Sequence, residues 1–322
     1  MKKNIIYLLL IIFSTFLNAN EKVVLQLKWF HQFQFAGYYA AKEKGFYDEV
    51  GLDVEIKQRD LKYNNIDEVI NGNAQYGVAD SILILYRLKQ QPVVIVSPIF
   101  QHSPSVFISL KKKNISSIYE LNNKDILFYP NDTDGFSLLA MIKKFDLDVN
   151  LIRERYKDDY MRLINNEVDA MPAYIANEPF LLKEKGYDVN IINPNNYGFD
   201  IYGDMLFTNE DEAKNYPIRV EKFKKATLKG WKYALENKEE IIQLISEKYS
   251  KEKSIEHLRY EANAIDSLID KDVTPLGYLD EGRIRYISEM YEYYGLTESK
   301  IDLNDFLFDE ISKKDKKLSL SD

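Results

Sequence analysis

Aromatic and amide side chains are concentrated in one short stretch near the N-terminus. Residues 29–39 contain Trp29, Phe30, His31, Gln32, Phe33, Gln34, Phe35, Tyr38 and Tyr39. A core segment rarely interleaves glutamine with aromatics so densely, whereas a binding loop stacks rings on a ligand and offers amides to its polar edge. The candidate ligand contacts from this stretch are Trp29, Gln32, Phe33, Phe35 and Tyr38. Packing of the rings beneath a loop is the alternative explanation.

Polar residues also follow several expected strands and turns. Ligands of open α/β sheets bind at the carboxyl ends of strands, near a point where the strand order reverses. Asp80 and Ser81 follow an expected strand at 75–78, and Tyr174 follows one at 168–173. With the turn at 130–135 and the segment 200–204, the further candidates are Asp80, Ser81, Asp134, Gly135, Tyr174, Asn177, Glu178, Tyr202 and Asp204. Helix capping is the alternative for the acidic members.

The charges at these positions bear on the kind of ligand. They are acidic or neutral, whereas a sulfonate or phosphate site needs Arg, Lys or a glycine-rich helix start. A buried carboxylate needs a donor or a cation as its partner. The sequence therefore favours a flat, amine-bearing heterocycle. An anionic solute, and a solute outside both classes, are the alternatives.

The sequence has no strong catalytic signature. It contains no Cys, and His31, His102 and His257 do not pair at the spacing of metal ligands. It has no glycine-rich phosphate loop, nucleophile elbow or zinc-protease helix. The acidic turn before Gly135 resembles the start of a calcium loop, but the glycine comes too early. We expect no catalytic residue, no metal and no cofactor.

Short strands that alternate with helices must position these side chains. Apolar runs predict strands at 23–27, 53–57, 75–78, 93–96, 106–110, 126–129, 149–155, 168–173 and 189–192. Helices are expected between them, and helical spacing continues from residue 216 onward, with one face at Val220, Phe223, Thr227, Trp231 and Ala234. This alternation indicates an α/β fold with mostly parallel sheets flanked by helices.

Two segments repeat one pattern. Residues 70–80 and 164–174 each show a helix end, a short turn, a buried strand and a polar or aromatic residue after it. Any α/β protein repeats such units, which is one explanation. The other is that two lobes of one design face each other across a ligand.

Composition and the N-terminus restrict the class of protein. Of its 322 residues, 45% are hydrophobic and 29% are charged, which is typical of globular proteins. This length is sufficient for two domains. Its formal charge of −8 argues against nucleic-acid binding. Residues 1–19 combine a basic start, an apolar run and a small residue at Ala19, which predicts a secretory signal peptide. Without Cys, the exported protein cannot carry a lipid anchor.

Three blocks of sequence resemble a known family. They are Leu27–Trp29, Phe35–Tyr47 and Val50–Val54, and stretches at 71–78, 166–170 and 202–207 fit as well. The family comprises periplasmic binding proteins for thiamine-pyrimidine precursors, alkanesulfonate and taurine binders, and fungal pyrimidine synthases. The resemblance covers residues 23 to about 307.

The resemblance implies a type II periplasmic-binding-protein fold, with lobe one at 21–110 plus 204–322 and lobe two at 111–203. It also implies a periplasmic monomer that captures a small molecule, such as a thiamine pyrimidine precursor, for an ABC permease in the membrane. Two departures matter. Leu83 stands where the fungal synthases have a histidine, and 200–204 contains no cysteine, so their enzymatic chemistry is not expected. Gln32 and Phe35 replace the Asn and His usual in the binding proteins. A sensory domain of a larger receptor remains the alternative.

Overall fold

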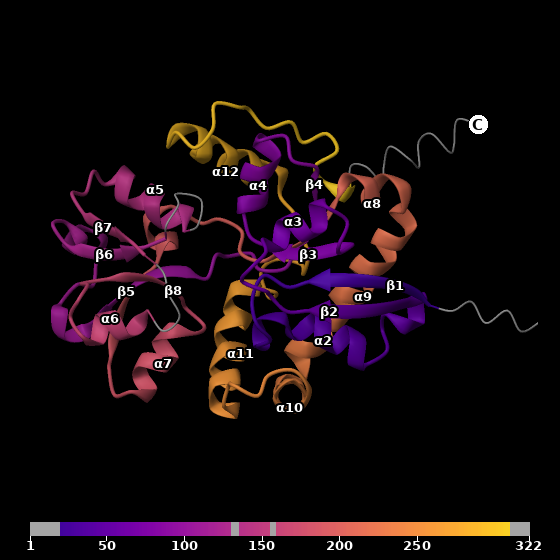
Figure 1. Ribbon diagram of the computed structural model, residues 1–322, viewed down its shortest axis with the longest axis horizontal. Coiled ribbons are helices and arrows are strands. Elements are labelled where there is room, and N and C mark those ends of the chain that lie inside the picture. The colour runs from indigo at the N-terminus through magenta and orange to yellow at the C-terminus, as the bar shows by residue number, and fades with distance from the viewer. Residues whose placement is uncertain (1–19, 130–134, 155–158, 310–322) are drawn as a thin grey trace, which may run out of the picture.

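A computed structural model describes residues 20–129, 135–154 and 159–309. It shows two α/β lobes side by side, the first built from both ends of the described chain and the second from its middle (Figure 1). The expected signal peptide at residues 1–19 and the candidate contact Asp134 lie outside the described residues.

A five-stranded mixed sheet in the order β2-β1-β3-β10-β4 forms the centre of the first lobe. Its strands are β1 (Glu21–Gln26), β2 (Leu52–Lys57), β3 (Tyr76–Ala79), β4 (Val93–Pro98) and β10 (Met205–Asn209). β1 pairs in parallel with β2 and β3, whereas β10 runs antiparallel between β3 and β4. A strand from late in the sequence therefore completes a sheet built by the N-terminal segment.

The second lobe repeats this arrangement. β5 (Ser105–Leu110) runs antiparallel between β8 (Met171–Tyr174) and β9 (Val189–Ile192), and β6 (Asp125–Phe128) pairs in parallel with β7 (Asn150–Arg153). A parallel bridge between Ile126 and Ala170 joins β6 to the start of β8. The resulting order, β7-β6-β8-β5-β9, matches that of the first lobe. The two repeated segments end in β3 and β8, which hold the same place in their sheets, as the two-lobe explanation predicted.

The α/β architecture is confirmed, but two details differ from the expectation. The sequence placed 106–110 in lobe one, whereas β5 pairs with β8 and β9 of the second sheet. An apolar strand has the same pattern whichever sheet it joins, so its partners could not be inferred. The sheets are also mixed rather than mostly parallel. The strand that follows each crossover, β5 in one sheet and β10 in the other, runs antiparallel to both of its neighbours.

Helices cover both sheets. Those formed by the flanking parts of the chain are α2 (Ala36–Glu43), α3 (Asn65–Ile70), α4 (Ile82–Leu88), α8 (Glu210–Asn215), α9 (Pro217–Glu236), α10 (Lys238–Lys248), α11 (Ile255–Ile269) and α12 (Glu281–Tyr293). Those of the middle part are α5 (Phe136–Lys144), α6 (Tyr160–Ile164) and α7 (Glu178–Glu184). None of the helices in the described ranges is long and apolar enough to cross a bilayer.

Close packing of α2 against α9 fixes the C-terminal end of the aromatic stretch, which lies on α2. The predicted apolar face of α9 is buried, including Trp231. A Cβ on Gly37 would lie 2.1 Å from Cγ of Trp231, so only glycine allows this approach. α2 ends before Gly45, whose φ of +75° is the left-handed conformation expected at a helix C-terminus.

The chain crosses between the lobes twice, at residues 99–104 and at residues 193–204, and these two crossovers form hydrogen bonds with each other. The backbone N–H groups of Ile99 and Phe100 donate to the carbonyl oxygen of Asp204 at 2.8 and 3.0 Å. Gly203 donates to the carbonyl oxygen of Phe100 at 3.1 Å, and a Cβ on Gly203 would lie 2.6 Å from the carbonyl oxygen of His102. The crossovers therefore form a narrow hinge, and the side chain of Asp204 projects from it.

Candidate functional site

A lysine and two aspartates meet where the strands of the first sheet end. The Lys28 ammonium lies 2.8 Å from Oδ2 of Asp80 and 3.0 Å from Oδ1 of Asp204. Lys28 follows β1, and Asp80 follows β3, which is parallel to it. Asp204 immediately precedes β10, and because β10 is antiparallel to β3, its first residues lie at the same edge. The topology thus places all three side chains at one point.

Gln34 and Tyr174 complete this group, which we call the Asp204 cluster (Lys28, Gln34, Asp80, Tyr174 and Asp204). Nε2 of Gln34 donates to Oδ2 of Asp204 at 2.7 Å, and the amide of Gln32 donates to Oε1 of Gln34. The Tyr174 hydroxyl donates to Oδ1 of Asp204 at 3.4 Å. Tyr174 is the last residue of β8 in the second sheet, so the cluster joins both lobes at the hinge.

Burial and charge act in opposite directions within the cluster. Burial alone would lower the pKa of Lys28, but the carboxylates of Asp204 and Asp80 outweigh it and raise that pKa above its ordinary value. Burial raises the pKa of Asp204, although Lys28 and Gln34 oppose the shift. For Asp80, Lys28 outweighs burial and lowers the pKa. The Asp80 side chain is 45% exposed and that of Asp204 only 2%, so Asp204 is the carboxylate most dependent on its partners.

A second polar group lies beside the first. The backbone N–H of Phe33 donates to Oε2 of Glu261 at 2.9 Å, and Glu261 forms an ion pair with Lys253. Nζ of Lys253 also donates to Oδ1 of Asn177 at 2.8 Å. Glu178 accepts from the backbone N–H of Tyr174 at 2.7 Å. The predicted contacts Asn177 and Glu178 thus hold the turn after β8 in place.

The aromatic stretch divides into exposed and buried rings. Trp29 is 46% exposed and packs edge-to-face on Phe30, with ring centroids 5.3 Å apart. Phe33 and Phe35 are buried in the core of the first lobe, as the packing alternative proposed for such rings. Tyr38 is buried against Trp231 with ring centroids 5.8 Å apart. Ligand contact by Phe33, Phe35 and Tyr38 stays a prediction.

Ser81 and Tyr202 are engaged with the backbone and with α12. The Ser81 hydroxyl donates to the carbonyl oxygen of Tyr202 at 2.6 Å. The Tyr202 hydroxyl accepts from the backbone N–H of Asp280 at 2.8 Å, and the Arg283 guanidinium lies 4.4 Å from the Tyr202 ring centroid. Both residues therefore support the hinge. Gly135 precedes α5 with φ +67°, a conformation that favours glycine.

Sequence reasoning missed Lys28, Gln34, Glu261 and Lys253. The signal for Lys28 was its place directly after the apolar strand 23–27, the position already used to select Asp80 and Tyr174. Glu261 and Lys253 gave no comparable signal, because only the tertiary fold brings Glu261 to Phe33 and Lys253 to Asn177. Within residues 20–129, 135–154 and 159–309, no three His, Cys, Asp or Glu side chains are grouped as metal ligands.

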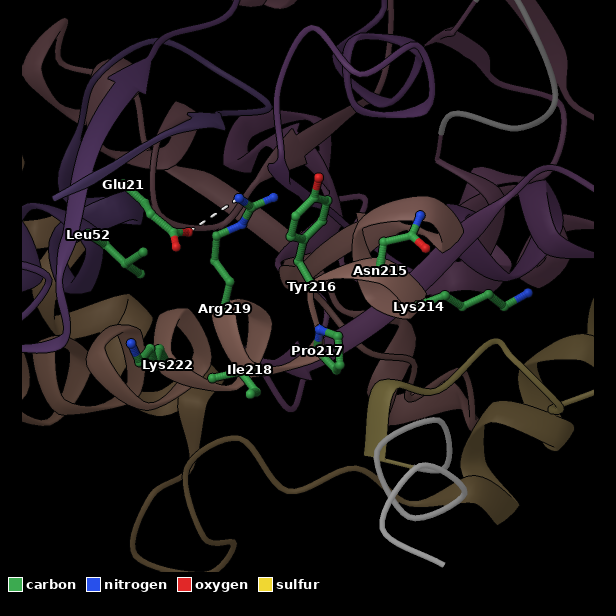
Figure 2. A pocket seen from close by; sticks show the side chains of 9 residues that line it. All are labelled: Glu21, Leu52, Lys214, Asn215, Tyr216, Pro217, Ile218, Arg219 and Lys222. Atoms are coloured by element: carbon green, nitrogen blue, oxygen red, sulfur yellow. Dashed lines mark hydrogen bonds and ion pairs between the residues drawn. The ribbon is translucent and has the colours of Figure 1, made fainter. Parts of the chain in front are cut away.

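A surface hollow of about 560 Å³ lies away from this cluster. Figure 2 shows its lining, from Glu21 at the start of β1 to the first turn of α9, where Arg219 pairs with Glu21 at 3.3 Å. Lys28 lies beyond the other end of β1, about 20 Å along the strand. We assign the candidate site to the Asp204 cluster, where groups from both lobes converge, rather than to this hollow.

Comparison with known sequences gives a consistent set of relatives. A family model described as NMT1/THI5 like matches residues 32–241. The riboflavin-binding protein RibY of Chloroflexus aurantiacus is 25% identical over 236 residues, which cover 70% of this chain and 65% of that protein. The formylaminopyrimidine-binding protein of Halalkalibacterium halodurans is 25% identical over 233 residues, 70% of each chain. The matched part thus spans slightly less than two thirds of RibY.

Comparison with solved structures identifies the fold. The periplasmic aliphatic sulphonate binding protein SsuA of Escherichia coli superposes with a TM-score of 0.69 at 12% identity, covering 90% of this chain and 98% of that one. The desulfurization enzyme DSZB superposes with a TM-score of 0.64 at 11% identity, covering 92% and 99%. At such identities the likeness shows the fold alone, which is the periplasmic-binding-protein fold expected from the sequence.

Proposed function

Because the chain belongs to the NMT1/THI5-like family, we propose that it is a solute-binding protein that captures a flat nitrogen heterocycle between its lobes and presents it to an ABC permease. The observation that carries this proposal is the Asp204 cluster. It combines a carboxylate, an amide and a phenol from both lobes at the hinge. Hinged closure over a small molecule brings such groups together and buries the ligand.

The charges of the cluster support the class of ligand. Lys28 neutralises one of the two carboxylates, so Asp80, Asp204 and Lys28 together carry one negative charge when all are ionised. The ammonium already lies between two carboxylates, which would repel a sulfonate. A ring amine can instead share Asp204, and the Gln34 amide can complement a donor–acceptor edge. The relatives named for riboflavin and formylaminopyrimidine binding are consistent with a planar nitrogen heterocycle.

The exposed ring of Trp29 supplies a surface for stacking. It follows Lys28 directly in the chain, and its exposure leaves a face free to contact a flat solute. The expected signal peptide would export the protein to the periplasm, where we infer that it acts as a monomer with a membrane permease as its partner. An enzyme would instead change the compound that it binds.

A calorimetric and thermal-shift panel tests the proposal. Purified protein is mixed with aminopyrimidines, riboflavin, alkanesulfonates and amino acids, and recovered ligand is checked by mass spectrometry. We expect stabilisation by a nitrogen heterocycle, recovered unchanged. Asp204→Asn should weaken binding about 10- to 100-fold, since a hydrogen bond to a charged group contributes about 1.5–3 kcal/mol. The control Asp53→Asn changes an exposed carboxylate on β2. Stabilisation by sulfonates alone would contradict the ligand class, and a chemically altered ligand would contradict the binding role.

A further inference from the structure

The helix α11 extends from the hinge to a contact with the second lobe. At its C-terminal end, the carbonyl oxygen of Leu268 accepts from the backbone N–H of His102 in the crossover at 3.1 Å. Near its N-terminal end, His257 lies about 16 Å farther along the helix axis. In Figure 1, α11 and α7 lie next to each other in the lower part of the view, whereas α12 lies in the upper part. A rotation about the hinge therefore displaces the N-terminal end of α11 relative to α7 more than it displaces the crossovers.

Three contacts join that end of α11, with the residues just before it, to the turn after β8 and to α7. Nζ of Lys253 donates to Oδ1 of Asn177 at 2.8 Å, and the Tyr260 hydroxyl donates to the carbonyl oxygen of Ile175 at 3.1 Å. The Phe180 ring stacks on His257, with centroids 4.5 Å apart and an interplanar angle of 22°. Each contact pairs the first lobe with the second, so opening the hinge must break them.

The same contacts are connected to the Asp204 cluster. Lys253 forms an ion pair with Glu261, and the two side chains are 16% and 2% exposed. Glu261 also accepts from the backbone N–H of Phe33, whose neighbour Gln34 donates to Asp204. A continuous series of contacts thus begins at Asp204 and passes through the loop at 32–35 to Glu261. From there it continues to Lys253 and the second lobe.

We propose that Lys253 and Tyr260 form a closure latch, which holds the two lobes together and couples their closure to the loop that binds Asp204. The latch rests on the two-lobed mechanism proposed above but not on the identity of the solute. Its loss should shift the balance toward the open form and speed ligand release, with little change in the rate of association. The residues act through the position of the lobes and need not touch the ligand.

The test measures lobe distance without ligand. The chain has no Cys, so Glu55→Cys on β2 and Lys183→Cys on α7 allow specific attachment of two dyes. Tyr260→Phe removes one hydroxyl while leaving the ring, and Lys253→Gln removes the charge. Lys251→Gln is the matched control, because Lys251 donates to the carbonyl oxygens of Ser246 and Glu247 at the end of α10 in its own lobe.

We expect Tyr260→Phe to shift the closed-to-open ratio about two- to tenfold, the effect of losing one hydrogen bond. Lys253→Gln should shift it further, and Lys251→Gln should match the parent. Identical single-molecule energy-transfer distributions for parent, Tyr260→Phe and Lys253→Gln would overturn the latch. Should Lys253→Gln fail to fold, Tyr260→Phe decides alone. Since no solute is present, this result is independent of whether the proposed ligand class is correct.

Discussion

Lys28 and Asp204 are 176 residues apart in sequence, yet the ammonium of one lies 3.0 Å from the carboxylate of the other. The pair forms because β1 and the antiparallel β10 both neighbour β3. The ammonium of Lys28 thus lies between the carboxylates of Asp80 and Asp204, for which the sequence alone indicated no cationic partner. The pair links the end of β1 to the crossover before β10, and we infer that it contributes to the stability of the folded protein.

Removal of Lys28 should destabilise the protein. Lys28→Met leaves the buried Asp204 carboxylate without its cation, and breaking one partner of a buried pair costs about 3–5 kcal/mol. The free energy of unfolding in urea, without ligand, measures this loss. The double variant Lys28→Met with Asp204→Asn should recover part of it, because no unpaired charge remains at Asp204. Lys57→Met, at an exposed position on β2, should change stability little. An equal loss in the single and double variants would contradict the pairing.

The outline of the fold could be predicted from residue patterns, whereas the pairing of distant segments could not. Alternating short strands and helices gave the α/β class, Gly45 marked the end of α2, and helical spacing found the buried face of α9. These features depend on neighbours within a few residues. β5 was placed in the wrong sheet because its apolar run carries no information about β8 and β9.

The same limit applies to the site. Asp80 and Tyr174 were selected because they follow predicted strands, and Asp204 because it lies in the segment 200–204. The structure brings the three side chains together. The argument from charge treated the acidic positions as unpartnered, since the contact of Lys28 with Asp204 spans most of the chain. Local density of aromatics could not distinguish the exposed Trp29 from the buried Phe35, because the turn of the chain around residues 33–35 decides which rings face the core.

Gly37→Ala should disturb the packing of α2 on α9. The new methyl group would meet the Trp231 ring at 2.1 Å, and overpacking of this kind typically costs 1–3 kcal/mol or more, so we expect a loss of at least about 2 kcal/mol. Chemical denaturation measures the loss, and near-ultraviolet circular dichroism reports the tryptophan environment. Gly37→Ala combined with Trp231→Leu should lose less stability than the sum of the two single changes. Strict additivity would show that the two residues do not interact.

His102 should make stability depend on pH. The hydrogen bond that Nδ1 of protonated His102 donates to the Asp200 carboxylate raises the pKa of His102 above 6.5, against the opposing effect of burial. The protonated form is thus favoured in the folded state, so its contribution is fully present below about pH 6.5 and is lost as pH rises through the folded pKa. The difference in unfolding free energy between the parent and His102→Gln should shrink from pH 6 to pH 8.5. Burial lowers the pKa of His31, so stability linked to His31 falls on acidification instead, and His31→Gln serves as the control of opposite sign. A difference that is constant across this pH range would refute the assignment.

Trp29→Ala should weaken ligand binding without a matching loss of stability. The ring is 46% exposed, so it contributes less buried area to the folded protein than a core tryptophan such as Trp231 does. Stacking on a flat solute contributes about 0.5–1.5 kcal/mol beyond area burial. We therefore expect the Kd of Trp29→Ala to be about two- to tenfold higher than that of the parent. Tyr293→Ala is the matched control, since Tyr293 on α12 is 82% exposed and lies outside the Asp204 cluster. Titration calorimetry with the heterocycle found in the panel gives the affinity, and thermal unfolding without ligand gives the stability. An unchanged Kd for Trp29→Ala would remove this ring from the site and leave the Asp204 cluster to bind the solute by its edge alone.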